Sequence, residues 1–234
     1  TGHYACIERP PTGKVRLLRG VDHTKDQSYV LSMLSQFQLS RSLLPLGTLT
    51  KQAVRAFAKE MALPVADRQD SQDLCFLGNV DYRDFLTRYA PDSLEKGDIV
   101  DNTGHVLGEH QGLAFYTIGQ RKGIRIAASE PYFVINKDQE NNRLVVGFAD
   151  ETGEKCLTAV QPNWISGVPP EIDSVYDVMV RYRSKPAPAV LTMTTEDKIR
   201  LEFMKRLRGI TPGQVAVLYR DDICLGGGVI SDTD

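Results

Sequence analysis

The stretch VYDVMVRYR (175–183) alternates apolar and polar side chains, the pattern of a β-strand with one buried face. One face would carry Tyr176, Val178, Val180 and Tyr182, and the other Asp177, Met179, Arg181 and Arg183. The same spacing recurs at Ile199, Leu201 and Phe203, and QVAVLYRDDICLGGGVI (214–230) predicts a hairpin that turns at Asp221 and Asp222. Short strands at this spacing predict a small C-terminal β-barrel or sandwich.

Further hairpins are predicted upstream of this region. DNTG (101–104) indicates a tight reversal, and PYFVINKD (131–138) with RLVVGF (143–148) indicates a second hairpin. The proline- and glycine-rich QPNWISGVPP (161–170) indicates a boundary before the C-terminal strands.

The first 80 residues mix strands and helices. VRLLRG (15–20) predicts a strand. One amphipathic helix is predicted from the spacing of Val30, Met33, Leu34 and Phe37, with Asp26 or Ser28 as its cap. A second helix would begin after Thr50, carry Val54, Phe57, Ala58 and Met61 on one face, and stop at Pro64. We therefore expect three domains, at 1–80, 81–158 and 159–234.

Composition narrows the functional classes. The 234 residues are 41% hydrophobic, yet no apolar run approaches the roughly 18 residues of a membrane span, and no secretory signal is evident. A cytoplasmic protein without a membrane partner is the default expectation.

The net charge of −2 gives no global basic field, but residues 181–208 hold eight Lys or Arg against three acids. The four cysteines lack CxxC spacing, which argues against a zinc site or a disulfide scaffold.

Several motifs admit both a functional and an ordinary interpretation. Lys25, Asp26 and Gln27 at a helix start suit phosphate binding, or simply cap a solvated helix. TIGQRKG (117–123) suits a phosphate contact or an exposed turn. GGG (226–228) lacks the frame of a P-loop and favours a strand bend. His105 and His110 are expected on the surface of a hairpin.

Cys75 in DSQDLCF (70–76) is either a small buried hydrophobe or a reactive sulfur. Its apolar neighbours and Asp73 disfavour the thiolate. If this thiol reacts, a residue distant in sequence, such as Arg121 or Arg68, should supply positive potential.

Seven segments, taken in order, resemble the signature series of the tRNA-specific 2-thiouridylases. They are TGHYA, LLRGVDHTKDQSYVL, LPLGTLTKQAVR, LPVADRQDSQDLCF, GLAFYTIGQRKGI, RYRSKP and ITPGQVAVLYRDDICLGGGVI. The resemblance runs from residue 1 to about 230. It implies an α/β plus β fold: a remnant of an adenine-nucleotide alpha-hydrolase-like α/β domain, a small β-rich central domain and a C-terminal β-barrel.

The resemblance also implies a chemistry. In the family, ATP adenylates the C2 oxygen of the wobble uridine, and a cysteine persulfide then displaces AMP to leave 2-thiouridine. Cys75 matches the persulfide carrier. The family's SGGVDSS-type loop and first catalytic cysteine are absent from this sequence, so the chain is expected to be an incomplete and inactive portion. Cys6, Cys156 and Cys224 are not expected to replace the missing thiol. ATP with Mg²⁺, tRNA and a sulfur-relay or cysteine desulfurase donor protein are the implied partners.

Site residues follow from the same match. Gly2 would lie at the ATP site and His3 near tRNA, and the tRNA contacts would be Lys25, Asp26, Gln27, Arg181, Tyr182 and Gln214. A cation at a helix start and an Arg/Tyr pair on a basic strand suit backbone and stacked-base contacts. A solvated strand face remains the alternative for Arg181. Two other hypotheses stay open: a tRNA-binding fragment without turnover, and an unrelated β-barrel with no RNA partner.

Overall fold

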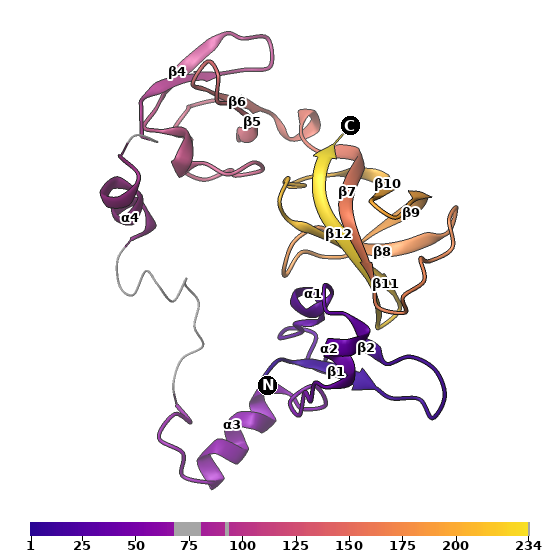
Figure 1. The fold of residues 1–234 in the computed structure, drawn as a ribbon. Helices are drawn as coiled ribbons and strands as arrows, with labels where there is room; N and C mark the ends of the chain where they lie inside the picture. The colour runs from indigo at the N-terminus through magenta and orange to yellow at the C-terminus, as the bar shows by residue number, and fades with distance from the viewer. Residues whose placement is uncertain (68–80, 92–93, 234) are drawn as a thin grey trace. The chain divides into compact units, whose positions relative to one another are not determined.

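The computed structural model describes residues 1–67, 81–91 and 94–233, which form two compact units (Figure 1). One unit holds Thr1–Arg68, Glu154–Arg206 and Ile210–Asp234, and the other holds Gln69–Gly153 with Leu207–Gly209. The expected boundary between residues 158 and 159 falls inside a strand of the first unit. The division into three domains stays a prediction.

A closed barrel of six antiparallel strands forms the larger part of the first unit. The strands are β7 (Glu154–Trp164), β8 (Val175–Met179), β9 (Ala187–Thr194), β10 (Lys198–Leu207), β11 (Val215–Arg220) and β12 (Ile223–Thr233). Their order is β12-β11-β8-β9-β10-β7, and pairing of β12 with β7 closes the barrel. Ile199, Leu201 and Phe203 of β10 are at most 1% exposed, so the predicted inward face is confirmed.

The glycine run bends β12 between its two neighbours. A Cβ on Gly227 would lie 1.8 Å from the carbonyl oxygen of Ala216 on β11, so only glycine fits there. The register with β7 shifts between Gly227 and Val229. The predicted strand bend and the predicted turn at Asp221 (φ 54°) are both confirmed.

The alternation predicted for residues 175–183 holds only in part. Tyr176, Val178 and Val180 are at most 2% exposed, but β8 ends at Met179, which is itself buried at 6%. The prediction that the strand continues to Arg183 is wrong. The carbonyl of Arg181 instead accepts bonds from the backbone and hydroxyl of Ser184, which closes a turn.

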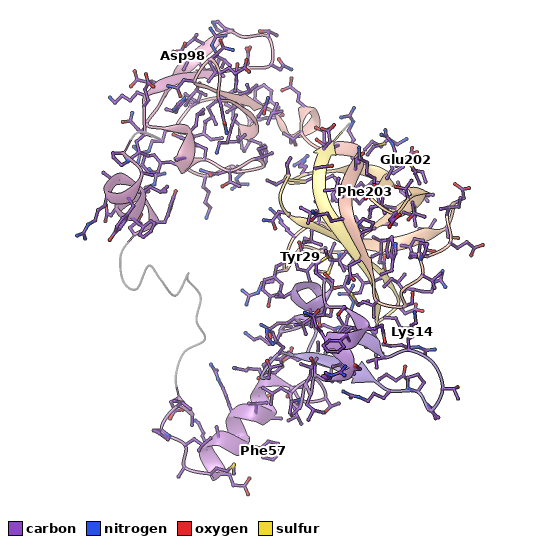
Figure 2. All side chains as sticks on the ribbon, in the orientation of Figure 1. Lys14, Tyr29, Phe57, Asp98, Glu202 and Phe203 are labelled. Carbon is purple, nitrogen blue, oxygen red and sulfur yellow. The ribbon has the colours of Figure 1, made fainter. Side chains whose placement is uncertain are left out.

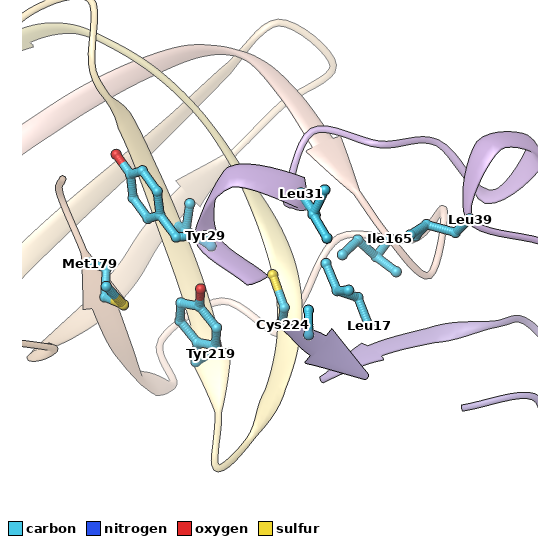
Figure 3. Packing of buried hydrophobic residues seen from close by; sticks show 10 residues of the cluster. Leu17, Tyr29, Leu31, Leu39, Ile165, Met179, Tyr219 and Cys224 are labelled. Atoms are coloured by element: carbon cyan, nitrogen blue, oxygen red, sulfur yellow. The ribbon is translucent and has the colours of Figure 1, made fainter. Parts of the chain in front are cut away.

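The N-terminal segment adds a hairpin to the barrel sheet. β1 (Ala5–Glu8) pairs with β2 (Arg16–Arg19), as predicted for the strand in VRLLRG, and β2 pairs with β12 through Leu17 and Leu18. The two regions share one hydrophobic core, in which the side chains of both converge (Figure 3). Its buried members are Ala5, Leu17, Tyr29, Leu31, Leu39, Ile165, Met179, Val217, Tyr219 and Cys224.

The single helix predicted across residues 30–37 is wrong. The chain forms α1 (Ser28–Leu31) and then α2 (Gln36–Ser40), and it buries Leu31 and Leu39 while Val30 and Phe37 are exposed. Ser35 opens α2 with a capping box: its hydroxyl accepts from the Gln38 backbone, and the Gln38 side chain accepts from the Ser35 backbone. This capping competes with a continuous helix.

The second predicted helix is confirmed as α3 (Lys51–Glu60). The Thr50 hydroxyl accepts a bond from the Ala53 backbone at 3.2 Å, and the helix ends before Pro64. The predicted apolar face is not buried by the described residues, because Phe57 is 51% and Met61 is 71% exposed. Figure 2 shows Phe57 projecting from α3.

The second unit contains α4 (Tyr82–Tyr89) and a mixed four-stranded sheet. Its strands are β3 (Gly97–Val100), β4 (Val106–His110), β5 (Phe133–Asp138) and β6 (Arg143–Gly147), in the order β4-β3-β6-β5. Both predicted hairpins are present, and β3 and β6 pair in parallel. The unit also holds the 3₁₀ turns η2 (Leu113–Phe115) and η3 (Ala149–Glu151).

His110 does not lie on the surface as predicted. It is 0% exposed; the Gly112 backbone donates to its Nδ1 at 3.1 Å, and its Nε2 lies 3.1 Å from the Asn142 carbonyl. Because a backbone N–H can only donate, Nδ1 accepts and Nε2 carries the proton. His105, in contrast, is exposed, as predicted.

Among the described helices none could cross a bilayer, since the longest, α3, has ten residues.

Candidate functional site

The loop that enters α1 holds Lys25, Asp26 and Gln27. The Asp26 side chain is only 6% exposed, and its carboxylate accepts from the Gly20 backbone (2.9 Å), the Ser28 backbone (3.1 Å) and the Ser28 hydroxyl (2.8 Å). It also lies 3.8 Å from Nη1 of Arg19. Asp26 therefore shapes the loop from inside.

Gln27 ties this loop to the start of β1. Its backbone donates to the Tyr4 carbonyl at 2.8 Å, and its side-chain oxygen accepts from the Tyr4 backbone at 3.0 Å. Half-buried Lys25 donates through its backbone to the Asp22 carbonyl at 2.9 Å. The Asp22 carboxylate in turn accepts from the Lys51 backbone at the start of α3, and this bond is the main reason that its pKa is lowered. The loop is held on both sides by backbone contacts.

Gly2 and His3 lie just before β1. The exposed Gly2 is not required by packing, because an added Cβ would meet only Leu46, at an ordinary 3.7 Å. The Nδ1 of His3 lies 2.7 Å from the Thr1 hydroxyl. Nothing in the described packing demands glycine at position 2, so a need for glycine there would come from a ligand.

Three distant stretches of chain meet at Tyr29 of α1. The ring of Tyr182 lies 6.3 Å from the Tyr29 ring, centroid to centroid, and the Tyr29 hydroxyl donates to the Val215 carbonyl at 2.8 Å. Gln214 precedes Val215 and is exposed, and Arg181 precedes Tyr182 and is also exposed. The structure thus brings Tyr182 and Val215, the neighbour of Gln214, to the helix that follows Lys25.

Exposed cations flank the Tyr182 ring in the chain. The Arg183 guanidinium lies 5.3 Å from the Tyr182 ring centroid. Arg181, Arg183 and Lys185 are all exposed in the turn after β8. Lys25, Arg181, Tyr182, Arg183 and Gln214 lie within or next to the segments that meet at Tyr29, and we call this group the α1–barrel face. Such a combination of cations, a partly exposed ring and an amide can contact phosphates and stack on or bond to bases.

A buried polar network joins the α1 loop to the barrel behind this face. The Arg19 guanidinium lies 3.8 Å from the Tyr219 ring centroid, and the Ser28 hydroxyl lies 3.1 Å from the Tyr219 hydroxyl. Burial raises the pKa of Tyr219, so its phenol stays protonated. Figure 3 shows the Tyr219 hydroxyl pointing toward α1.

The cysteines divide into described and undescribed residues. Cys75, the predicted persulfide carrier, lies outside the described residues, as does Arg68, one of the two residues suggested as a source of positive potential for it. Burial raises the pKa of Cys6, and it raises the pKa of the 1% exposed Cys224 to about 12. Cys6 and Cys224 are therefore thiols at neutral pH. That state fits the expectation that neither replaces a catalytic cysteine.

Comparison with known proteins gives a consistent assignment along the chain. Three family models match: "tRNA methyl transferase HUP domain" at residues 1–79, "tRNA methyl transferase PRC-barrel domain" at 83–148 and "Aminomethyltransferase beta-barrel domain" at 154–230. Curated relatives named tRNA-specific 2-thiouridylase MnmA include those of Carboxydothermus hydrogenoformans (44% identical), Cupriavidus metallidurans (43%) and Nostoc punctiforme (46%). Each alignment covers 98% of this chain.

The chain belongs to the tRNA-specific 2-thiouridylase family. It spans 63% to 66% of the length of these three relatives. The predicted fold class is confirmed, because the models place part of a HUP domain before a PRC-barrel domain and a C-terminal β-barrel.

Several residues of this thiouridylase-family chain that organise the site were missed by sequence reasoning. Ser28, Tyr29 and Tyr219 form the contacts between α1 and the barrel, and Gln36 bonds the carbonyls of Val15 and Ile165 across the two regions. The capping pattern Ser35-x-x-Gln38 was readable and would have revealed the break between α1 and α2. No local signal marks Tyr219, because its partners lie almost 200 residues away.

Proposed function

We propose that this chain is the portion of a tRNA 2-thiouridylase that binds tRNA and carries the sulfur-donating thiol, Cys75. The observation that carries the proposal is the 43% to 46% identity over 98% of the chain to relatives named tRNA-specific 2-thiouridylase. The α1–barrel face is consistent with it, since its residue types suit RNA.

On this proposal the predicted tRNA residues divide into two roles. Lys25 and Arg181 contact backbone phosphates, Tyr182 stacks on a base, and Gln214 hydrogen-bonds to a base or sugar. His3 approaches the RNA beside Gly2. Asp26 and Gln27 act mainly as positioning residues, because their side-chain oxygens already accept bonds within the loop.

The proposed chemistry transfers a sulfur atom to C2 of the wobble uridine. ATP, with Mg²⁺, would supply the activation of the uracil oxygen as a leaving group. Gly2 is the proposed ATP contact, and packing alone would tolerate an added Cβ there, since it would meet only Leu46, at 3.7 Å. Cys75 carries the sulfur as a persulfide, received from a sulfur-relay or cysteine desulfurase protein in a cytoplasmic setting.

Two alternatives remain distinct from this proposal. A fragment that binds tRNA without turnover would show the RNA contacts and no thiolation. Two of the matched family models carry the description tRNA methyl transferase, so methylation is the other candidate reaction. 2-Thiouridine and a methylated nucleoside differ in mass, so mass analysis distinguishes thiolation from methylation.

The test uses the natural full-length protein with tRNA, ATP and a persulfide donor, followed by mass analysis of digested nucleosides. We expect 2-thiouridine with the wild type and none with Cys75→Ser, whereas tRNA affinity changes little. Cys156→Ser is the matched control and should retain thiolation, since Cys156 is a half-buried barrel residue. If Cys75→Ser still forms 2-thiouridine, this thiol takes no part in the reaction. If the wild type forms a methylated nucleoside instead, the proposal of thiolation is wrong.

A further inference from the structure

The second unit presents a loop that the proposed function has not used, Thr117–Arg125, which we call the cationic loop. The side chain of Gln120 holds it from within: its oxygen accepts from the Thr117 backbone at 3.0 Å, and its nitrogen donates to the Lys122 carbonyl at 2.8 Å. Gly119 donates to the Val134 carbonyl at 2.8 Å. The loop is thus a defined shape before any ligand arrives.

Both ends of the loop are anchored to the unit. Val134 of β5 donates to the Gln120 carbonyl at 2.9 Å, and Ile124 is 4% exposed in the core of the second unit. Between these anchors the chain turns outward. A preformed loop loses little conformational entropy when its side chains bind a partner.

The side chains at the tip of the cationic loop carry positive charge. Arg121, Lys122 and Arg125 are exposed, and within the described part of the chain none of them forms an ion pair. These three like charges lie within five residues of sequence, and like charges closer than the Debye length of about 8 Å repel one another. A polyanion would relieve that repulsion.

A fourth cation lies beside the loop. Nη2 of Arg83 lies 3.8 Å from the position of an added Cβ on Gly123, and its guanidinium lies 5.1 Å from the Phe115 ring centroid. Arg83 and Arg125 border a hollow of about 230 Å³. The hollow also contains Glu109, which pairs with Lys96 at 3.4 Å. This carboxylate disfavours a small anion deep in the hollow, so negative groups would bind along the rim.

We propose that the cationic loop, with Arg83, is a second RNA-backbone contact of this chain, on a different compact unit from the α1–barrel face. The proposal rests on the proposed function for the identity of the RNA as tRNA. The exposed, spaced cations suit successive phosphodiester groups, whereas a single free phosphate is usually enclosed by backbone N–H groups. The interpretation of TIGQRKG as a phosphate contact is thereby preferred to that of a bare turn.

The test measures tRNA binding by the full-length protein over a range of salt concentrations. For Arg121→Ala/Lys122→Ala we expect affinity to fall by about one order of magnitude and the slope of log K against log salt to fall by about two. Arg121→Glu/Lys122→Glu should weaken binding further. Both double variants change the same two exposed residues. An unchanged thermal midpoint of unfolding would establish that each variant is folded.

Lys155→Ala/Arg143→Ala is the matched control. It removes the same charge, but Lys155 pairs with Glu202 at 2.9 Å, and Arg143 faces Asp138. We expect a much smaller change in slope. An unchanged slope in the loop variants, or an equal change in the control, would overturn the inference. That outcome is separable from failure of the proposed function, in which the wild-type protein forms no 2-thiouridine whatever its salt dependence.

Discussion

At the scale of single residues, Gly47 and Gly2 differ in whether packing requires glycine. A Cβ on Gly47 would lie 1.9 Å from the Ala5 carbonyl oxygen and 2.9 Å from Sγ of Cys6. A Cβ on Gly2 would meet Leu46 at 3.7 Å, which is ordinary contact. Gly47 is therefore required for the chain to pack against β1. Gly2 is free of that constraint.

This contrast predicts different stability effects. Gly47→Ala should push β1 away from its neighbours and lower the free energy of unfolding by about 1–3 kcal/mol, as overpacking does. Gly2→Ala, the control, should stay within about 0.5 kcal/mol of the wild type. Urea denaturation of the full-length protein measures both. Equal midpoints for the two variants would show that the close approach of Gly47 to Ala5 is not a constraint.

At the scale of elements, α1 is joined to the barrel by polar contacts as well as by the shared core. Asp26 and Ser28 lie at the start of this helix, Arg19 comes from β2, and Tyr219 comes from β11. A helix of four residues has little stability of its own. Its position, and with it the α1–barrel face, depends on this network.

Removal of the central carboxylate should be costly. Asp26→Ala deletes three accepted hydrogen bonds and leaves Arg19, whose side chain is 14% exposed, without its acid. We expect a loss of about 3 kcal/mol, the scale for breaking one partner of a buried pair. Glu8→Ala breaks the exposed Glu8–Arg16 pair and should cost at most about 1 kcal/mol. Thermal denaturation compares them, and similar shifts would contradict a structural role for Asp26.

At the scale of the whole molecule, the RNA contacts proposed here are shared between two compact units. The α1–barrel face belongs to the first unit and the cationic loop to the second. The net charge of −2 means that binding depends on such local groups rather than on an overall field.

Arg181→Ala should therefore weaken tRNA binding and lower its salt slope by about one phosphate contact. Lys59→Ala is the control, because Lys59 pairs with Asp67 at 2.9 Å in the exposed region of α3. Filter binding at several salt concentrations measures both variants. A slope for Arg181→Ala equal to that of the control would mean that this side chain only faces solvent.

Elements with strong local patterns were predictable. The inward residues of β10, the hairpin at Asp221 and the Thr50 cap of α3 follow from spacing and turn chemistry over a few neighbouring residues. The end of β8 at Met179 was not, because the turn that closes on Ser184 competes with an alternation that continues in the sequence to Arg183. The sequence predicted which residue types form the candidate site, but it did not predict which segments of the chain meet there.

By itself, the sequence determined the strand-rich C-terminal half, the membership of the 2-thiouridylase family and the residue types of the proposed site. Tertiary structure alone decided that β2 pairs with β12, that His110 is buried, and that Asp26 is enclosed while Tyr182 and Val215 contact Tyr29 of α1. The physical reason is the distance along the chain between the residues that interact. Turns, caps and alternating faces depend on interactions between near neighbours, whereas burial and convergence depend on contacts such as Ser28 with Tyr219, which the sequence separates by 191 positions.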